Sequence, residues 1–312
     1  MMEWWHGIIL GLVQGIAEFL PISSSGHLTI MQETLGIGGE GNLAFDIAVH
    51  VATVLSTLVI FWKPVFNLGK GLFAKGMNRE KDYILKILVS MIPILIVGLF
   101  FKDWVERIFD TERVARHTGN PLLVVGICLI VTAVLLLISE IISAVRDLKK
   151  GKDGEDKEQK IADRMTVAEN ATGPERRKIF SLQNGINYWQ AFVVGVAQSF
   201  AVLPGLSRSG STIATGLMSK VRRVPLAQFV FIMVIIPILG EAFLELLKLF
   251  KGHDMSNFFS VPVLCGFLAA FVSGLFACTL MVKLLKRFRL WGFAVYCFIA
   301  GVLCIVLPYA IR

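Results

Sequence analysis

The fold of this chain follows from one stretch near its N-terminus, Gln14-Gly-Ile-Ala-Glu18-Phe-Leu-Pro21-Ile-Ser23-Ser24-Ser25-Gly26-His27. A variant returns at an offset of 184 residues, as Gln198-Ser-Phe-Ala-Val-Leu-Pro204-Gly-Leu-Ser207-Arg208-Ser209-Gly210-Ser211-Thr212. Two further identical pairs, Trp5/Trp189 and Gly11/Gly195, precede the stretches at the same offset. We infer an internal duplication that organises the whole molecule.

The composition around these stretches is that of a membrane protein. Hydrophobic residues make up 55% of the chain and charged residues only 17%, whereas soluble domains carry about a quarter charged residues. Several apolar runs approach the roughly 20 residues that a membrane-spanning helix needs. They are continuous rather than alternating, which excludes a transmembrane β-barrel. The sequence therefore predicts an all-α polytopic membrane protein.

Six apolar segments are predicted to span the membrane. They are 44–62, 83–101, 121–142, 226–247, 259–282 and 290–311. Two further segments, 4–35 and 188–219, are apolar but interrupted by Pro21 and Pro204, and proline breaks a helix interior. Irregular backbone at membrane depth must be buried in protein or line a cavity. Both segments are predicted to be re-entrant helix–loop–helix hairpins with their serine clusters at the tips.

The chain is predicted to contain two membrane repeats, residues 1–142 and 188–312, joined by a polar cytoplasmic linker at 143–187. The net charge of +8 comes mainly from connections such as 63–86 and 283–289. This is the positive-inside pattern of cytoplasmic loops, so nucleic acid is not an expected partner. Because three spans separate the hairpins, the repeats are predicted to have inverted topology, with the tips meeting near the midplane.

Glu18 and Gln14 lie four residues apart and therefore share one helix face. A carboxylate within the membrane costs roughly 2.5–3.5 kcal/mol on insertion scales, so it usually serves a functional cavity. The alternative is a structural Glu18 bonded to the neighbouring hairpin. Asp46 and His50 are also four apart and could line the same cavity, or could be a structural pair.

The cluster Ser23, Ser24, Ser25, Gly26 and His27 follows Pro21 and opens another helix. One serine would cap this helix, and free N–H groups at its start would attract an anion. A serine hydroxyl becomes a nucleophile when a base removes its proton, and either His27 or Glu18 could be that base. A structural role for His27 is the alternative.

The second cluster contains an arginine among small polar residues, and its members are Ser207, Arg208, Ser209, Gly210, Ser211 and Thr212. A guanidinium in an apolar segment needs an anion, and its planar fork matches phosphate oxygens. The alternative is an Arg208–Glu18 ion pair without a role in substrate binding. Together, the two clusters carry the chemistry of phosphate handling.

The two motifs together resemble the bacterial undecaprenyl-diphosphate phosphatase family, also called bacitracin-resistance proteins. The resemblance covers essentially the whole chain apart from 143–187, and the segment from Phe45 to His50 matches a third recurrent stretch. It implies hydrolysis of undecaprenyl diphosphate to undecaprenyl phosphate and inorganic phosphate, which supplies the carrier lipid for cell-wall synthesis and confers resistance to bacitracin.

The resemblance also implies roles for individual residues. Ser24 takes the nucleophile position, Glu18 and His27 the acid/base or cation-associated positions, and Arg208 the diphosphate clamp. The remaining substrate-binding candidates are Gln14, Ser23, Ser25, Gly26, Ser207, Ser209, Gly210, Ser211 and Thr212. A Mg or Ca ion is expected to travel with the diphosphate, with Glu18 as its candidate ligand, and no organic cofactor is expected. Many members of the family carry Glu where this chain has Gln14, which leaves one carboxylate fewer for a metal.

The resemblance places the protein in the inner membrane of a bacterium, with a polyprenyl diphosphate lipid as partner; a homodimer is left open. Two alternatives remain. Type 2 phosphatidic acid phosphatases use a histidine nucleophile downstream of a Ser-Arg, but here only His253, in a predicted loop, follows Arg208. A lipid or anion transporter would share the inverted repeat without requiring a serine beside a histidine and a glutamate.

Overall fold

The computed structural model describes residues 2–37, 43–101, 111–149, 184–252 and 260–310. Within these ranges every regular element is a helix, and six helical segments are long and apolar enough to cross a membrane. These segments are Leu43–Ile60, Arg79–Phe101, Leu123–Arg146, Arg223–Leu247, Val261–Leu285 and Trp291–Ala310. Each overlaps one predicted span, so the all-α multi-pass class is confirmed.

Each duplicated stretch folds as two helices with a break around its proline. The first consists of α1 (Trp4–Phe19) and α2 (Ser24–Thr34). The second consists of α11 (Tyr188–Phe200) and α12 (Arg208–Met218). Pro21 explains the first break, because the residue before a proline is driven out of the helical region and Leu20 is the C-cap of α1. The second helix, α11, ends four residues before Pro204. The helix–break–helix prediction is confirmed, while the inverted relation of the two repeats stays a prediction.

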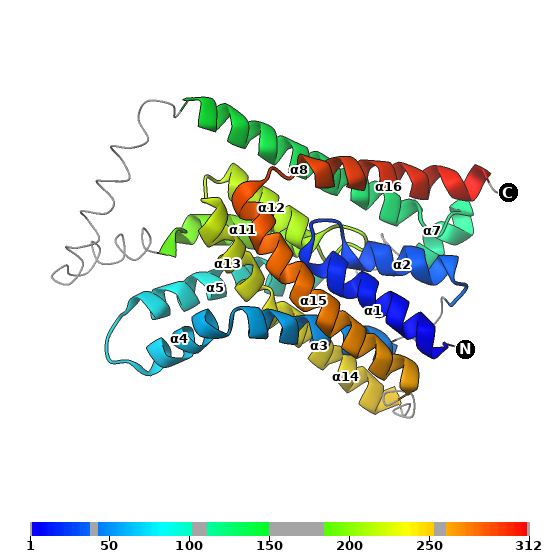
Figure 1. Ribbon diagram of the computed structural model, residues 1–312, viewed down its shortest axis with the longest axis horizontal. Helices are drawn as coiled ribbons and strands as arrows, with labels where there is room; N and C mark the ends of the chain where they lie inside the picture. Colours follow the sequence, from blue (N-terminus) through cyan, green and yellow to red (C-terminus); the bar gives the residue numbers. More distant parts are fainter. Residues whose placement is uncertain (1, 38–42, 102–110, 150–183, 253–259, 311–312) are drawn as a thin grey trace.

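The long helices surround these hairpins. In Figure 1, α8 (Leu123–Lys149) and α16 (Trp291–Ala310) lie side by side along one edge of the molecule. The helix α15 (Val261–Arg287) crosses the centre, where it packs on α1 and on α3 (Leu43–Ile60). Both termini lie at the same end of the bundle.

Two spans are irregular, and proline accounts for both. The predicted span 226–247 consists of α13 (Arg223–Met233) and α14 (Ile235–Gly252). The ring of Pro237 would clash with the carbonyl group of the residue four positions earlier, which ends α13. The helix α5 (Arg79–Ile96) contains Pro93 and continues as a π-helical turn, η2 (Val97–Phe101), a local adjustment that accompanies kinks.

Small residues let the first arm of each hairpin approach a long helix of the other repeat. A Cβ added at Gly11 would stand 2.3 Å from the carbonyl oxygen of Gly266 on α15. A Cβ at its duplicate, Gly195, would stand 2.2 Å from the carbonyl oxygen of Ser90 on α5. Such contacts replace the hydrophobic driving force that lipid does not supply. The two halves are therefore held together by reciprocal contacts, α1 on α15 and α11 on α5.

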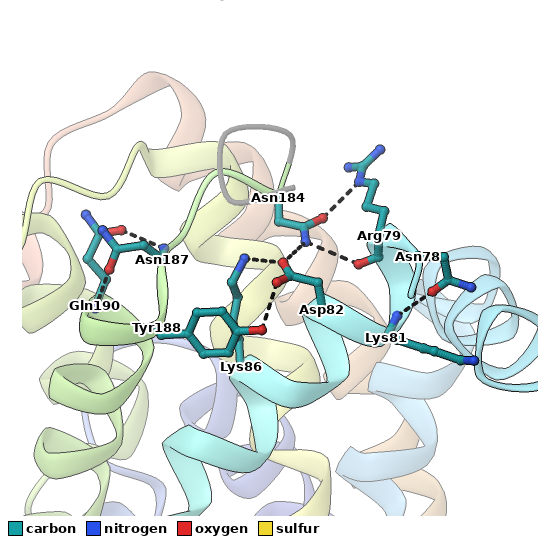
Figure 2. Close-up of polar contacts among 9 residues, drawn as sticks. All are labelled: Asn78, Arg79, Lys81, Asp82, Lys86, Asn184, Asn187, Tyr188 and Gln190. Carbon is teal, nitrogen blue, oxygen red and sulfur yellow. Dashed lines mark hydrogen bonds and ion pairs between the residues drawn. The ribbon is translucent and has the colours of Figure 1, made fainter. Parts of the chain in front are cut away.

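A buried polar cluster fixes the beginning of α5 to the beginning of α11 (Figure 2). The side chains of Asp82 and Lys86 are fully buried, and Lys86 Nζ donates to Asp82 Oδ2. Asp82 also accepts hydrogen bonds from Asn184 Nδ2 at 3.0 Å and from the Tyr188 hydroxyl at 2.8 Å. Arg79 Nε donates to Asn184 Oδ1 at 2.8 Å. The buried Asp82 carboxylate therefore has a counter-charge and two further hydrogen-bond donors.

This cluster corrects the prediction that 63–86 is a polar connection. Its first part is the helix α4 (Trp62–Phe73), and its last part already belongs to α5. Lys86 was counted as a loop charge, but it is paired inside the protein. Likewise, α8 continues to Lys149, beyond the predicted start of the linker at 143, and Arg146 donates to the Leu217 carbonyl oxygen at 2.8 Å. Residues 150–183 of the predicted linker lie outside the described residues, as does His253, and residues 184–187 lead into α11.

Candidate active site

The helix α2 starts at Ser24, and Ser23 is its N-cap. The Ser23 Oγ atom accepts a hydrogen bond from the Gly26 N–H at 3.2 Å. The backbone of Ser23 has a φ of 72°, a region that non-glycine residues rarely enter. Such a conformation costs of order 1–3 kcal/mol and is often found at functional sites. The turn reverses the chain, so that Ser24 faces back toward α1.

Ser24 contacts Glu18 across the break in the hairpin. Its hydroxyl group donates to Glu18 Oε2 at 2.6 Å, and Gln14 Nε2 donates to the same oxygen at 3.0 Å. A hydroxyl bonded to a carboxylate at this distance is a strong, charge-assisted contact. Of the two bases that the sequence left open, Glu18 is the one in contact with Ser24.

His27 is bonded on both sides, but not to Ser24. One ring nitrogen, Nδ1, lies 2.8 Å from the Ser23 carbonyl oxygen, and the other, Nε2, lies 2.7 Å from the Tyr296 hydroxyl. Because a carbonyl oxygen only accepts, these partners assign the proton to Nδ1, with Nε2 accepting from Tyr296. The Tyr296 ring also stacks on the His27 ring, with centroids 5.6 Å apart. His27 thus holds the strained Ser23 backbone in place.

The second hairpin repeats the capping arrangement. Ser207 Oγ accepts from the Gly210 N–H at 3.0 Å, so that Arg208 is the first residue of α12, as Ser24 is of α2. Thr212 Oγ1 donates to the Arg208 carbonyl oxygen at 2.8 Å. Ser211 Oγ is buried without a hydrogen-bond partner among the described residues. The second cluster therefore shapes the helix start that presents Arg208.

The tips of the two hairpins touch. The Gly205 N–H donates to Ser25 Oγ at 3.3 Å, and Ser209 Oγ donates to the Leu20 carbonyl oxygen at 2.9 Å. Gly205 has a φ of 89°, and a Cβ there would stand 2.8 Å from Val125 Cα. Only glycine satisfies both conditions. The structure thus brings the two predicted clusters, far apart in sequence, into one site.

Arg208 forms an ion pair that the sequence analysis did not anticipate. Its Nη2 atom lies 3.2 Å from Glu241 Oε2 on α14. The suggested Arg208–Glu18 pair is therefore wrong for this structure, because Glu18 is bonded to Ser24 and Gln14. The signal for Glu241 was present, since it is a carboxylate within the apolar run 226–247. It was missed because no repeated motif surrounds it.

A small cavity joins the two charged groups. Its walls carry Glu18, Arg208 and Gln198, with Thr53 and Thr57 from α3 and apolar residues of α13 and α14. The cavity volume is about 20 Å³, enough for roughly one water molecule. Arg208 Nη1 is buried and has no hydrogen-bond partner among the described residues. A fixed positive charge and a carboxylate therefore face one confined space.

Further oxygen atoms that could bind a cation lie near Glu18. The side-chain oxygens of Gln14 and Gln198 are buried and unpartnered within the described part of the chain. His50 Nδ1 lies 2.7 Å from the Asp46 carbonyl oxygen, so these residues bond to each other within α3. No group of three or more His, Cys, Asp or Glu side chains forms a metal site among the described residues. Any cation here would depend on amide oxygens as well as Glu18.

Comparison with known proteins agrees with this chemistry. Residues 7–303 match the family described as bacitracin resistance protein BacA. A protein of Parabacteroides distasonis named undecaprenyl-diphosphatase is 46% identical over 307 residues, which cover 97% of this chain and 98% of that protein. One of the same name from Bacteroides fragilis is 46% identical over 308 residues, covering 98% of each chain. Another, from Methanosphaera stadtmanae, is 34% identical over 322 residues, covering 98% of this chain and 99% of that protein.

Proposed function

This chain belongs to the bacitracin resistance protein BacA family, and from that premise we propose that it is a multi-pass membrane undecaprenyl-diphosphatase. The reaction hydrolyses undecaprenyl diphosphate to undecaprenyl phosphate and inorganic phosphate, and so supplies carrier lipid for cell-wall synthesis. The relatives carry the name of a hydrolase, and the transporter alternative finds no support among them.

The hydrogen bond between Ser24 and Glu18 carries the mechanistic part of the proposal. Glu18 accepts the Ser24 hydroxyl proton as the oxygen attacks the terminal phosphorus. The bond from that phosphorus to the bridging oxygen breaks, and undecaprenyl phosphate leaves with the electron pair. Water then attacks the phosphoserine, which releases inorganic phosphate and restores the serine hydroxyl. Glu18 takes a proton in the first step and returns it to the Ser24 oxygen as the bond between that oxygen and phosphorus breaks in the second.

Arg208 and the helix starts supply the electrostatic part. A phosphoryl transfer needs fixed positive charge on the transferred group, with little covalent work from the protein. Arg208 already presents one unpartnered nitrogen at the cavity, and its other contact is to the half-exposed Glu241. The N–H groups that open α2 and α12 add donors for phosphate oxygens. The two hairpins thus divide the task, the first for attack and the second for binding.

A divalent cation fits the donors on the wall of the cavity. Mg²⁺ and Ca²⁺ prefer oxygen ligands, and Glu18 and Gln198 provide them on the cavity wall, with the unpartnered oxygen of Gln14 on the residue bonded to Glu18. Bound with the diphosphate, such a cation would neutralise its charge. In this arrangement Gln14 orients Glu18 through its amide nitrogen and keeps its oxygen available for the cation.

Release of inorganic phosphate from undecaprenyl diphosphate by the purified protein tests the proposal. Ser24→Ala should lower kcat by roughly three orders of magnitude or more, as loss of a nucleophile does in other enzymes. Thr34→Ala is the matched control, because it removes a hydroxyl group from the same helix, and that hydroxyl bonds, among the described residues, to the Ile30 carbonyl oxygen alone. Unchanged turnover in Ser24→Ala would exclude the serine nucleophile. A wild-type protein without phosphatase activity would exclude the proposed function.

A further inference from the structure

A second, larger cavity lies beside the first hairpin. It is a groove of about 530 Å³ between the hairpin tip and the connection from α15 to α16. Leu20 and Ile22 line one wall, Leu284 and Phe293 line the other, and Arg289 stands at the α15–α16 connection. Tyr296 completes the lining on α16. Among the described residues, the groove is therefore mostly apolar, with Arg289 as the one charged side chain in its wall.

This groove adjoins the first hairpin at the candidate active site. The Tyr296 hydroxyl lies 2.7 Å from His27 Nε2, and His27 in turn holds the Ser23 backbone. Ile22 precedes Ser23 and Ser24 in the chain, so the groove wall runs directly into the catalytic turn. Tyr296 thus stands at the boundary, with its ring in the apolar groove and its hydroxyl group in the polar site.

The two cavities differ in what they can hold. The cavity beside Glu18 and Arg208, at about 20 Å³, cannot take a hydrocarbon chain. The groove lies within the range of about 300–1,000 Å³ that is typical of small-molecule sites. A lipid diphosphate must place its head group and the first part of its chain next to each other. The groove is the adjoining apolar space of sufficient size.

We propose that this groove binds the first isoprene units of the polyprenyl diphosphate, with Tyr296 marking where the chain meets the head group. The inference rests on the proposed function. The isoprenoid chain of the lipid would run from Ser24 toward Arg289. An ordinary phospholipid would lie the other way, with its phosphate at Arg289. The contact between Tyr296 and His27 favours the first orientation, because it links the inner end of the groove to the site where the diphosphate reacts.

Gly292 offers a clean way to fill the groove. It lines the groove, and a Cβ added there would meet no atom within 4 Å. Gly292→Leu therefore adds an apolar side chain without forcing the backbone apart. Gly98→Leu is the matched control, since Gly98 lies on a different span, is also exposed, and also has open space at its Cβ position.

The measurement compares kcat/KM for undecaprenyl diphosphate and for inorganic pyrophosphate, which has no isoprene unit, in lipid nanodiscs. Gly292→Leu should lower the ratio of the two values about tenfold, the loss expected when a few methylene groups lose their burial. Gly98→Leu should leave the ratio unchanged. A ratio that stays at the wild-type value in Gly292→Leu would overturn the proposal and leave a phospholipid as the occupant.

Photolabelling provides a second readout that does not depend on turnover. A polyprenyl diphosphate with a diazirine in its first isoprene unit should label the groove between Leu284 and Tyr296, and Gly292→Leu should suppress that labelling. Labelling confined to other helices would refute the groove even if the wild-type protein is active. A wild-type protein that is labelled in the groove but hydrolyses nothing would retain the groove and reject the phosphatase.

Discussion

Ser24 and Glu18 come from different helices of one hairpin, so a single proton transfer across the Pro21 break can activate the nucleophile. The strained Ser23 backbone makes this contact possible, and His27 secures that backbone through its Nδ1–H. The sequence left open whether Glu18 or His27 is the base, and their different contacts in the structure distinguish them. Glu18 acts on the Ser24 proton, and His27 acts on the position of the turn.

Glu18→Gln should therefore lower kcat by roughly 10²–10⁴-fold, the usual contribution of a general base. Glutamine keeps an oxygen that can accept the Ser24 hydrogen bond, so the turn should stay folded. Phosphate release at saturating lipid, with the melting temperature as a control for folding, measures the effect. If kcat falls less than tenfold, another group removes the proton.

Glu241→Gln should strengthen substrate binding, because it removes the carboxylate that competes with phosphate for Arg208. Glu241 is more than half exposed, and an exposed ion pair is worth at most about 1 kcal/mol. We expect KM for undecaprenyl diphosphate to fall by about two- to fivefold, with kcat little changed. Initial rates over a range of substrate concentrations test this. A higher KM would mean that Glu241 orients Arg208 for the substrate rather than competing with it.

At the scale of elements, the buried pair of Asp82 and Lys86 fixes how α11 enters the bundle (Figure 2). Lys86→Met should destabilise the protein by about 3–5 kcal/mol, since it leaves a buried carboxylate without its counter-charge. Adding Asp82→Asn should recover most of that loss, because asparagine can still bond to Tyr188 and Asn184. Thermal unfolding of both variants in one detergent provides the comparison. A double variant no more stable than Lys86→Met would show that the charges themselves are required.

The sequence predicted these elements well where a single physical rule controls them. Both hairpins are interrupted in the segments that contain Pro21 and Pro204, and Ser23, one of the three serines offered as a cap, caps α2. The matching cap of α12 by Ser207 was not predicted. The prediction failed where a polar residue is paired with a distant one. Lys86 looked like a loop charge although its partner Asp82 is only four residues away, because Tyr188 and Asn184, which complete the buried cluster, lie beyond a long polar segment. The choice between Glu18 and His27 as base likewise needed the backbone of Ser23, which no residue pattern specifies.

At the scale of the whole molecule, the most extensive helix–helix contacts join one half of the chain to the other. The helix α1 packs on α15, α11 on α5 and α8 on α16, with glycines at each crossing. At the last of these, a Cβ at Gly126 would stand 2.8 Å from the Gly301 carbonyl oxygen. The surfaces that these glycines line are therefore covered by helices of the other half. The duplication is therefore visible in the packing as well as in the sequence.

A protein cut within residues 150–183 should consequently remain assembled and active. We expect a protease site placed there to yield two fragments that co-migrate on size-exclusion chromatography in detergent and release phosphate at the uncut rate. Either half expressed alone should be degraded, because its glycine-lined faces have no partner. Separation of the fragments after cleavage would show that the covalent connection, not the helix packing, joins the halves.

Ser24 and Arg208 occupy the same place in the duplication, the first position of the helix that follows each break. In a dimer of two identical single-repeat ancestors, this position would have carried the same residue on both sides. Such a symmetric ancestor could have had two nucleophiles or two cations there, but not one of each. Within one chain the two copies are free to differ, and they differ both here and at Glu18, whose counterpart is Val202, so that one hairpin carries the nucleophile with its base and the other the cation.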